Sequence, residues 1–405
     1  MNVLFLSIYE IKDSNSKYIY ADLIKEFSKH GHNVYAVSPS SNGKSESFVD
    51  QNGVHIIRVK SGTIQKTNKI KKALNLMLFD SRVISAVKKS AKGVKFDLII
   101  TMVANLSLYK TTKYFKKKHN AYVYMSIKDI LPHNAVDMGM ITKKGVYGLI
   151  YRYYRSQEIK YYKLVDKIGC MSEANCDFIL NLNPYLNRDK VEVQYNSIEP
   201  IDFELTQEEK DEMRKKYDIP LDKTVFVYGG NLGKPQGVPF IIDCLKAQKN
   251  NEEVFFLIVG SGTEYGKLEE YCLESNSKNV KLMKALPRED YDKMIGACDV
   301  GLIFLDFSFT VPNFPSRLLS YMQAKLPVLA CTDVNTDVGK FIVSKGFGWW
   351  CQSNDVVAFE NCVNDVLNSD LKAMGIVANN CLLNEFSVKN GYDLIISGCK
   401  NDIKK

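Results

Sequence analysis

The sequence of 405 residues has no apolar run long enough to cross a bilayer. A membrane-spanning helix needs roughly 18 to 20 uncharged apolar residues in succession, so we expect none here. The first residues, MNVLFLSIYE, also lack the positively charged leader and the small-residue cleavage site of a signal peptide. We therefore expect them to form a first β-strand in a cytoplasmic protein.

Histidine and paired cysteine are scarce as well. The chain has five histidines, and its ten cysteines are scattered without a C-x-x-C pair or a histidine at zinc-binding spacing. This pattern favours reduced, mostly buried thiols. No Asp-x-Asp pair lies in a position suited to a divalent metal. We therefore expect no bound metal and no cofactor.

What the sequence does contain is a repeated alternation of apolar runs and helical patterns. Runs typical of buried parallel strands include NVLFLSI, YVYMSI, TVFVYGG, EEVFFLIV and VGLIFLD. We predict an α/β protein with two Rossmann-like domains, each built on a parallel sheet. The dinucleotide fingerprint G-x-G-x-x-G, with an acidic residue about 20 positions later, is missing after the first strand of either half. This absence disfavours a nicotinamide-dependent enzyme.

The boundary between the domains is expected near residues 196–200. There NSIEP interrupts the pattern before the charged helix LTQEEKDEMRKKYDIP. We predict an N-terminal domain of residues 1–198, a C-terminal domain of residues 199–385, and a final helix, residues 386–405, that packs back on the N-terminal domain. Two domains of roughly 200 residues also suit a chain of this length.

The two halves differ in charge. Residues 1–197 contain 31 Lys and Arg against 16 Asp and Glu, a net charge of +15, whereas the remainder has a net charge of −7. A basic half suits an anionic membrane surface or a nucleic acid, but no recognised nucleic-acid module accompanies the charge. Tyrosine and lysine gather in residues 110–120 and 147–165. Such segments either meet a membrane interface or are helix faces packed on the sheet.

A glycine-rich turn, GGNLGKPQG at residues 229–237, follows one predicted strand and precedes a helix. Its glycines let the backbone approach a ligand, and Lys234 supplies a positive charge. Because helix N-termini at the carboxyl ends of parallel strands bind phosphate, we predict a ligand site here. The alternative is a plain turn with a solvated lysine. A second turn, residues 260–262, supports a Rossmann-like sheet without identifying a ligand.

A third segment, TVPNFPSRLLSYMQAKLPVLACTD, contains a further candidate cation. Ser316 is expected to cap a helix whose first turn holds Arg317. A positive charge at that helix end is unfavourable, and a bound anion would remove the conflict. In the alternative, Arg317 extends into solvent. Lys234, Arg317 and two helix N-termini are therefore predicted to form a diphosphate site.

The order of these segments resembles that of the retaining family 4 glycosyltransferases of bacterial polysaccharide assembly, which have two facing Rossmann-like domains, the GT-B architecture. The landmarks are GGNLGKPQG, FFLIVGSGTEYGKLEEY, VKLMKALPREDYDKMIGACDVGLIFLD and FPSRLLSYMQAKLPVLACTDVNTD. The N-terminal segments KDILPHNAVDMG, KIGCMSEAN and YNSIEP resemble capsule and O-antigen transferases that include N-acetyl-L-fucosamine transferases. The resemblance covers nearly the whole chain.

The resemblance implies that a UDP-sugar is the co-substrate. Backbone around Ala285 and Leu286 is then expected to contact the uracil, Ser320 the ribose, and backbone near Asn313 the sugar. The predicted donor-binding residues are Gly230, Asn231, Gly233, Gln236, Gly262, Ala285, Leu286, Asn313, Ser316 and Ser320.

The chain departs from the family at four positions in and near this site. Asn231 and Gln236 replace the usual Arg and Lys of the first turn, and Pro312 and Ser320 replace paired glutamates. Lys234 is thus the cation left in that turn.

On the N-terminal side, Asp129 and His133 follow the strand YVYMSI. With Lys234 and Arg317 they complete the predicted catalytic set. The alternative is that Asp129 caps the next segment and that His133 is a surface residue.

The expected activity is transfer of a sugar from a UDP-sugar to a polyprenyl-diphosphate-linked saccharide, without metal and with retention of the anomeric configuration, by a protein bound peripherally to the inner face of the cell membrane. A UDP-sugar 2-epimerase of the same architecture and a non-catalytic sugar-nucleotide-binding protein are the alternatives. Five histidines offer little material for an epimerase centre.

Overall fold

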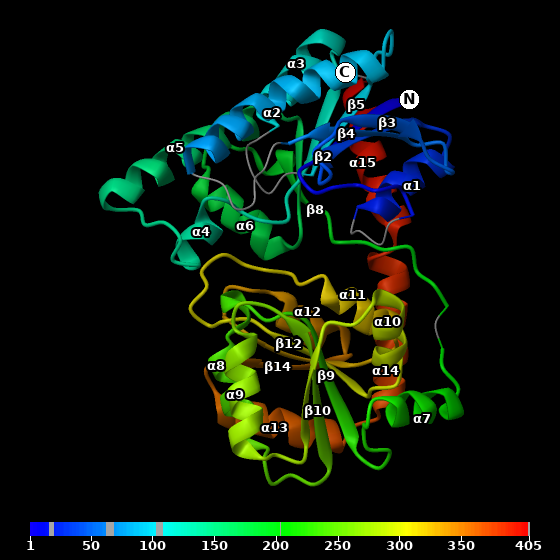
Figure 1. Ribbon diagram of the computed structural model, residues 1–405, viewed down its shortest axis with the longest axis vertical. Coiled ribbons are helices and arrows are strands. Elements are labelled where there is room, and N and C mark those ends of the chain that lie inside the picture. The colour runs from blue at the N-terminus through cyan, green and yellow to red at the C-terminus, as the bar shows by residue number, and fades with distance from the viewer. Residues whose placement is uncertain (16–19, 62–68, 103–107, 203, 404–405) are drawn as a thin grey trace. The chain divides into compact units, whose positions relative to one another are not determined.

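The computed structural model describes residues 1–15, 20–61, 69–102, 108–202 and 204–403, with the backbone alone for 69–77 and 401–403. Residues 404–405 of the predicted final helix lie outside this description. The chain divides into two compact units (Figure 1). Unit 1 comprises Met1–Glu199 and Ser387–Lys405, and unit 2 comprises Pro200–Phe386.

Unit 1 is built on a sheet with the order β3-β4-β2-β1-β5-β6-β7-β8. Its strands are β1 Asn2–Ser7, β2 Asn33–Ser40, β3 Glu46–Val49, β4 His55–Lys60, β5 Leu98–Met102, β6 Tyr122–Ser126, β7 Lys167–Cys170 and β8 Val191–Val193. All neighbours pair in parallel except β3, which runs antiparallel to β4. The helices are α1 Ala21–Lys29, α2 Lys69–Ser90, α3 Tyr109–His119, α4 His133–Asp137, α5 Gly145–Leu164, α6 Glu173–Leu182, the 3-10 turn η1 Arg188–Lys190 and α15 Val388–Ile403.

The last helix, α15, packs beside α1 on one face of this sheet (Figure 1). Tyr392 of α15 meets the ring of Phe27 edge-on, with ring centroids 4.8 Å apart, and Phe27 in turn contacts Phe5 of β1. The hydroxyl of Tyr392 lies 2.9 Å from Nε2 of His32. The C-terminal segment is therefore part of the core of unit 1, because its aromatic side chain fills the layer above the central strands.

Unit 2 is built on a sheet of parallel strands with the order β11-β10-β9-β12-β13-β14. The strands are β9 Thr224–Asn231, β10 Val254–Ser261, β11 Val280–Lys284, β12 Val300–Phe304, β13 Val328–Thr332 and β14 Gly348–Gln352. The helices are α7 Gln207–Lys216, the 3-10 turn η2 Lys234–Gln236, α8 Val238–Ala247, α9 Tyr265–Ser275, α10 Arg288–Gly296, α11 Arg317–Gln323, α12 Val338–Lys345, α13 Val356–Leu367 and α14 Leu371–Glu385. Helices α8 and α9 lie to one side of the sheet, and α10 and α14 to the other (Figure 1).

The prediction of an α/β protein with two parallel-sheet Rossmann-like domains is confirmed. Two edge strands were not predicted. Strand β3 has alternately half-buried and exposed side chains, and β14 has only one fully buried residue. Edge strands cover less of the core, so their sequences carry a weaker apolar pattern. No helix within the described residues combines the length and the apolar character needed to cross a membrane.

Candidate functional site

Two glycine turns meet at the carboxyl ends of β9 and β10. Gly230 has a φ of +126°, which favours glycine. A Cβ on Gly260 would lie 2.0 Å from the carbonyl oxygen of Gly230, and one on Gly262 would lie 2.3 Å from that of Leu232. These turns therefore touch backbone to backbone, which no larger residue would allow. The predicted site residues Gly230 and Gly262 belong to this contact.

A side chain of the same segment holds the first turn in shape. Oε1 of Gln236 accepts hydrogen bonds from the backbone N–H of Gly233 and from Nδ2 of Asn231, both at 3.0 Å. Gln236 is buried, whereas Asn231 and Lys234 are exposed. Gln236 thus shapes the turn with its side-chain carbonyl oxygen, while Lys234 is an exposed residue of η2.

The guanidinium of Arg317 lies against this turn. Its Cζ is 4.3 Å from the ring centroid of Tyr228, and a Cβ on Gly230 would lie 3.6 Å from its Nη2. Nη1 of Arg317 is buried and has no hydrogen-bond partner among the residues that the structure describes. The solvent-extended alternative for Arg317 is therefore wrong. A buried donor without a partner is costly, so this arrangement is suited to an anionic ligand.

Two tyrosines that the sequence analysis missed surround the same place. The hydroxyl of Tyr321 donates to the carbonyl of Leu302 at 3.0 Å and accepts from the N–H of Gly229 at 3.2 Å. A Cβ on Gly229 would lie 1.5 Å from the hydroxyl oxygen of Tyr291. Burial raises the pKa of Tyr291 and Tyr321, so both stay neutral at physiological pH. In the sequence, each of these tyrosines shows only the spacing typical of a helix face. Ordinary buried aromatic residues show the same spacing, so it did not mark a site.

The predicted cap of the helix that holds Arg317 is absent. Ser316 occupies the N-cap position of α11, but its side chain makes no cap hydrogen bond. Its φ of −64° and ψ of −17° are helical, whereas a capping side chain needs an extended backbone to reach the next N–H groups. Ser316 is exposed, and its place among donor-binding residues stays a prediction.

The backbone at Asn313 is held by a buried carboxylate that the sequence analysis also missed. Oγ1 of Thr336 accepts from the N–H of Asn313 at 3.1 Å and donates to Oδ2 of Asp333 at 2.9 Å. Oδ1 of Asp333 accepts from the N–H groups of Asn335 and Thr336. Burial raises the pKa of Asp333. Asp333 follows β13 directly. An acidic residue at the carboxyl end of a predicted strand is therefore the sequence feature that could have indicated it.

The remaining donor-side residues lie around the start of α10. Ala285 is exposed and Leu286 half-buried in the turn between β11 and α10. Nη2 of Arg288 in the first turn of α10 donates to Oγ of Ser320 on α11, at 3.3 Å. Arg288 therefore links the predicted uracil-binding turn to the predicted ribose-binding serine.

In unit 1, Asp129 lies just beyond β6. It is exposed and accepts a hydrogen bond from Nδ2 of Asn134 at 3.3 Å, so it does contact the following segment. The surrounding protein raises the pKa of its carboxyl by removing water. The neighbouring Lys128 was not singled out from the sequence, yet burial lowers its pKa to about 7, and its Nζ donates to the carbonyl of Gln194. This strand end thus has two titratable groups with shifted pKa values.

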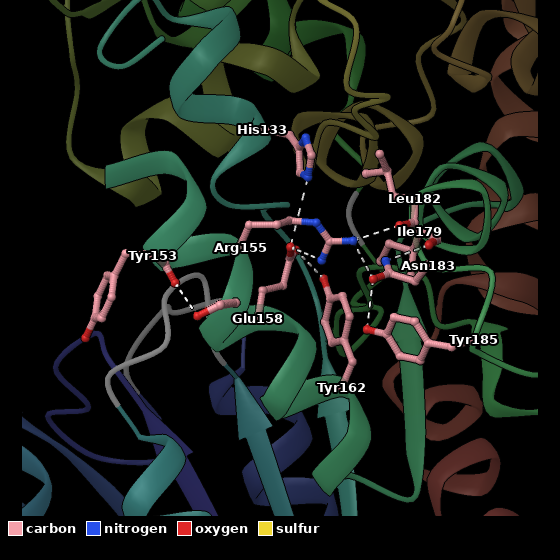
Figure 2. Close-up of polar contacts among 10 residues, drawn as sticks. His133, Tyr153, Arg155, Glu158, Tyr162, Ile179, Leu182, Asn183 and Tyr185 are labelled. Atoms are coloured by element: carbon pink, nitrogen blue, oxygen red, sulfur yellow. Dashed lines mark hydrogen bonds and ion pairs between the residues drawn. The ribbon is translucent and has the colours of Figure 1, made fainter. Parts of the chain in front are cut away.

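His133 is buried, so its surface alternative is wrong. Only 4% of the residue is exposed, and its ring meets those of Tyr151 and Phe178 edge-on. Nε2 lies 4.0 Å from Oε2 of Glu158 and has no hydrogen-bond partner within the described parts of the chain (Figure 2). Burial, with Arg155 nearby, lowers the pKa of His133 to about 4. The neutral imidazole therefore contributes mainly to packing between α4 and α5.

The depressed pKa of His133 predicts an acid-sensitive contribution to stability. The unfolded chain takes up a proton near pH 6.5 and the folded chain only near pH 4, so stability is lost as pH falls between these values. Between pH 7 and pH 5 we expect the free energy of unfolding of the native chain to fall by about 1–2 kcal/mol more than that of His133→Gln. Urea unfolding of both proteins at each pH measures the difference. Parallel pH profiles would contradict it.

Among the residues that the structure describes, no group of three or more His, Cys, Asp or Glu side chains is arranged to hold a metal ion. The structure brings Arg317 and Gly230 together, and it groups Asn231, Gly233 and Gln236 in one turn. Asp129 and His133 belong to the other unit.

Residues 209–380, almost all of unit 2, match the family model of the glycosyl transferases group 1. The Pseudomonas aeruginosa protein WbjE, named a probable glycosyltransferase, is 23% identical over 304 residues, which cover 75% of this chain and 74% of that protein. WcaI of Escherichia coli K12, named for colanic acid biosynthesis as a glycosyl transferase, is 29% identical over 133 residues, 32% of each chain.

The fold is also found in solved structures. Anabaena HepE in complex with UDP-glucose superposes with a TM-score of 0.70 at 14% identity, over 99% of this chain and 100% of that chain. At this identity the likeness shows the fold alone. Residues 209–380 are thus similar in sequence to the glycosyl transferases group 1, the chain has the GT-B fold, and the comparisons together support glycosyltransferase activity.

Proposed function

We propose that the chain transfers a sugar from a UDP-sugar to a polyprenyl-diphosphate-linked saccharide in the synthesis of a bacterial capsule or O-antigen. The observation that carries this proposal is the guanidinium of Arg317, which lies beside the Gly230 turn and whose buried Nη1 has no partner in the described chain. A diphosphate offers the oxygens that such a group lacks. The UDP-glucose bound by HepE and the polysaccharide pathway in the name of WcaI support the choice of donor and of product.

In the proposed reaction, the bond between the anomeric carbon and the diphosphate oxygen breaks, and its electron pair stays on that oxygen. Arg317, with Lys234 at the surface of the same turn, stabilises the growing negative charge. The acceptor hydroxyl forms the new bond on the face that the diphosphate leaves, so that the configuration is retained. Its proton passes to a base.

Three contacts are proposed to hold the rest of the donor. Backbone at Ala285 and Leu286 binds the uracil, and Ser320, oriented by Arg288, binds the ribose. Backbone at Asn313, held through Thr336, contacts the sugar. N-acetyl-L-fucosamine or a related amino sugar is the proposed donor sugar, on the resemblance of three N-terminal segments alone.

Asp129 is the proposed acid/base group of unit 1, because it is accessible and has a raised pKa. We propose that His133 acts only by positioning α4, since its ring is enclosed by Tyr151 and Phe178. The basic unit 1 suits an acceptor held at the cytoplasmic face of an anionic membrane.

The test is incubation of the purified protein with a panel of UDP-sugars and a polyprenyl-diphosphate-linked acceptor, with product mass as the readout. A product heavier by one sugar supports the proposal. Release of a C2 epimer without transfer would indicate the epimerase, and UDP binding without turnover would indicate a binding protein. NMR coupling at the new anomeric centre tests retention.

Activity is expected to survive EDTA, because the proposed charge stabilisation comes from protein cations and helix N-termini. The measurement is kcat of protein treated with chelator, compared with the same protein supplied with magnesium or manganese. Complete loss in chelator that either metal restores would contradict the proposal.

A further inference from the structure

Exposed apolar side chains gather at the start of α5. Of the 21 large apolar side chains exposed in the described residues, seven lie within residues 140–154. They include Val146, which is 76% exposed, Met140 at 67%, Leu149 at 59% and Tyr153 at 57%. Soluble surfaces rarely concentrate large apolar side chains in this way unless they bind a partner.

The charge around this apolar group has one sign. In residues 138–165 the basic side chains are Lys143, Lys144, Arg152, Arg155, Lys160 and Lys163, and the only acidic one is Glu158. Glu158 is buried, and Arg155 donates to it at 2.8 Å. Every exposed charge of this segment is therefore positive. Segment 110–120, the other tyrosine- and lysine-rich one, differs, because none of the exposed large apolar side chains of the described residues lies in it.

The buried network beneath the second half of α5 fixes the orientation of this surface. Nη2 of Arg155 donates to Oδ1 of Asn183 at 2.6 Å and to the carbonyl of Leu182 at 2.7 Å. Tyr162 donates to Glu158 at 2.8 Å. Arg155 and Glu158 point into this network, whereas Tyr153 points away from it (Figure 2). Helix α5 is thereby anchored to α6 by one face while its first turns stay exposed.

We propose that this surface, the exposed apolar side chains of residues 140–154, which we call the α5 patch, inserts into the interfacial layer of an anionic membrane. Apolar and tyrosine side chains enter the boundary between headgroups and acyl chains, and the flanking lysines meet anionic headgroups. The mixture of apolar groups with one sign of charge favours a lipid surface over a protein partner, which would be expected to place acidic side chains opposite the lysines.

The inference rests on the proposed lipid-linked acceptor, since docking here would hold unit 1 where such an acceptor lies. Binding to a membrane is nevertheless measured without any donor or acceptor, so its failure and the failure of the proposed activity can be told apart. Binding to vesicles without transferase activity would support the α5 patch and contradict the proposed reaction. Sugar transfer by a protein whose vesicle binding does not depend on the patch would support the proposed reaction and contradict the α5 patch.

The experiment is sedimentation of the full chain with vesicles of phosphatidylcholine containing about 30% phosphatidylglycerol, an anionic lipid. The double variant Val146→Ser/Leu149→Ser is expected to bind about tenfold more weakly, because two inserted apolar side chains are lost while the charge is unchanged. The matched control is Leu273→Ser/Val357→Ser, two side chains of unit 2 that are 79% and 66% exposed and lie outside the patch. It should bind like the native chain.

Insertion is tested separately by Tyr153→Trp and vesicles that carry brominated acyl chains. Quenching of the new indole, beyond that of the native chain, is the expected result, because the side chain should enter the layer near the acyl chains. Equal binding by the native chain and Val146→Ser/Leu149→Ser, or no added quenching, would overturn the proposal. The proposal would also be overturned if the native chain is a dimer and Val146→Ser/Leu149→Ser is a monomer, because the patch would then be a contact between two copies of the chain.

Discussion

Replacement of Arg317 by alanine is expected to lower kcat by about 10² to 10³-fold, the range found when one preorganised donor to a developing charge is removed. Arg317 has its Cζ 4.3 Å from the ring centroid of Tyr228 and a buried Nη1 without a partner in the described residues. Its position is thus set before the ligand arrives. A charge held in a site with little water acts more strongly than one in solvent.

Two further variants separate charge from geometry. Arg317→Lys should recover part of the rate, because an ammonium cannot offer two parallel hydrogen bonds to phosphate oxygens. Lys234→Ala should lower kcat less than Arg317→Ala does, because Lys234 is exposed and water screens its charge.

The control is Lys293→Ala, an exposed lysine of α10, which should keep native kcat and KM. Thermal unfolding of each variant shows whether the fold is intact. Native turnover in Arg317→Ala, with an unchanged melting temperature, would mean that the diphosphate is bound elsewhere.

The second large effect is expected from Gly260→Ala. The added Cβ would lie 2.0 Å from the carbonyl oxygen of Gly230, so the paired carboxyl ends of β9 and β10 must move apart. We expect a loss of about 2 to 4 kcal/mol in the free energy of unfolding, as for an overpacked core position. Because a shift of about 1 Å in a binding group can cost about 10²-fold, we expect a similar fall in kcat/KM for the donor.

Gly266→Ala is the matched control, in the α9 helix that follows the same turn. Apart from the adjacent residues and the backbone of the helix itself, no atom of the described residues lies within 4 Å of a Cβ placed there. Alanine in an exposed helical position should raise stability by up to about 1 kcal/mol and leave the kinetics unchanged. Urea unfolding and donor titration measure both variants. If Gly260→Ala behaves like Gly266→Ala, the close contact of the two turns has no functional role.

The sequence predicted the parallel sheets because buried strands carry continuous apolar runs such as VFFLIV, and these runs depend on local order alone. Local sequence also predicted the glycine turn at residues 229–237, in which Gly230 has a positive φ. The edge strands β3 and β14 were missed because an edge strand buries less and so has less pattern to detect.

The chemistry at individual side chains depended on segments far apart in the sequence. Local spacing placed Arg317 in the first turn of a helix, but only the packing of α11 against β9 decided that its guanidinium lies over Tyr228, 89 positions earlier in the chain. Likewise, the contacts of His133 with Tyr151 and Phe178 decided that it is a buried neutral group. Composition and periodicity determined the fold and its turns. The burial of a side chain and the identity of its hydrogen-bond and ring partners were decided only by the assembled core, because desolvation depends on every element that packs around a group.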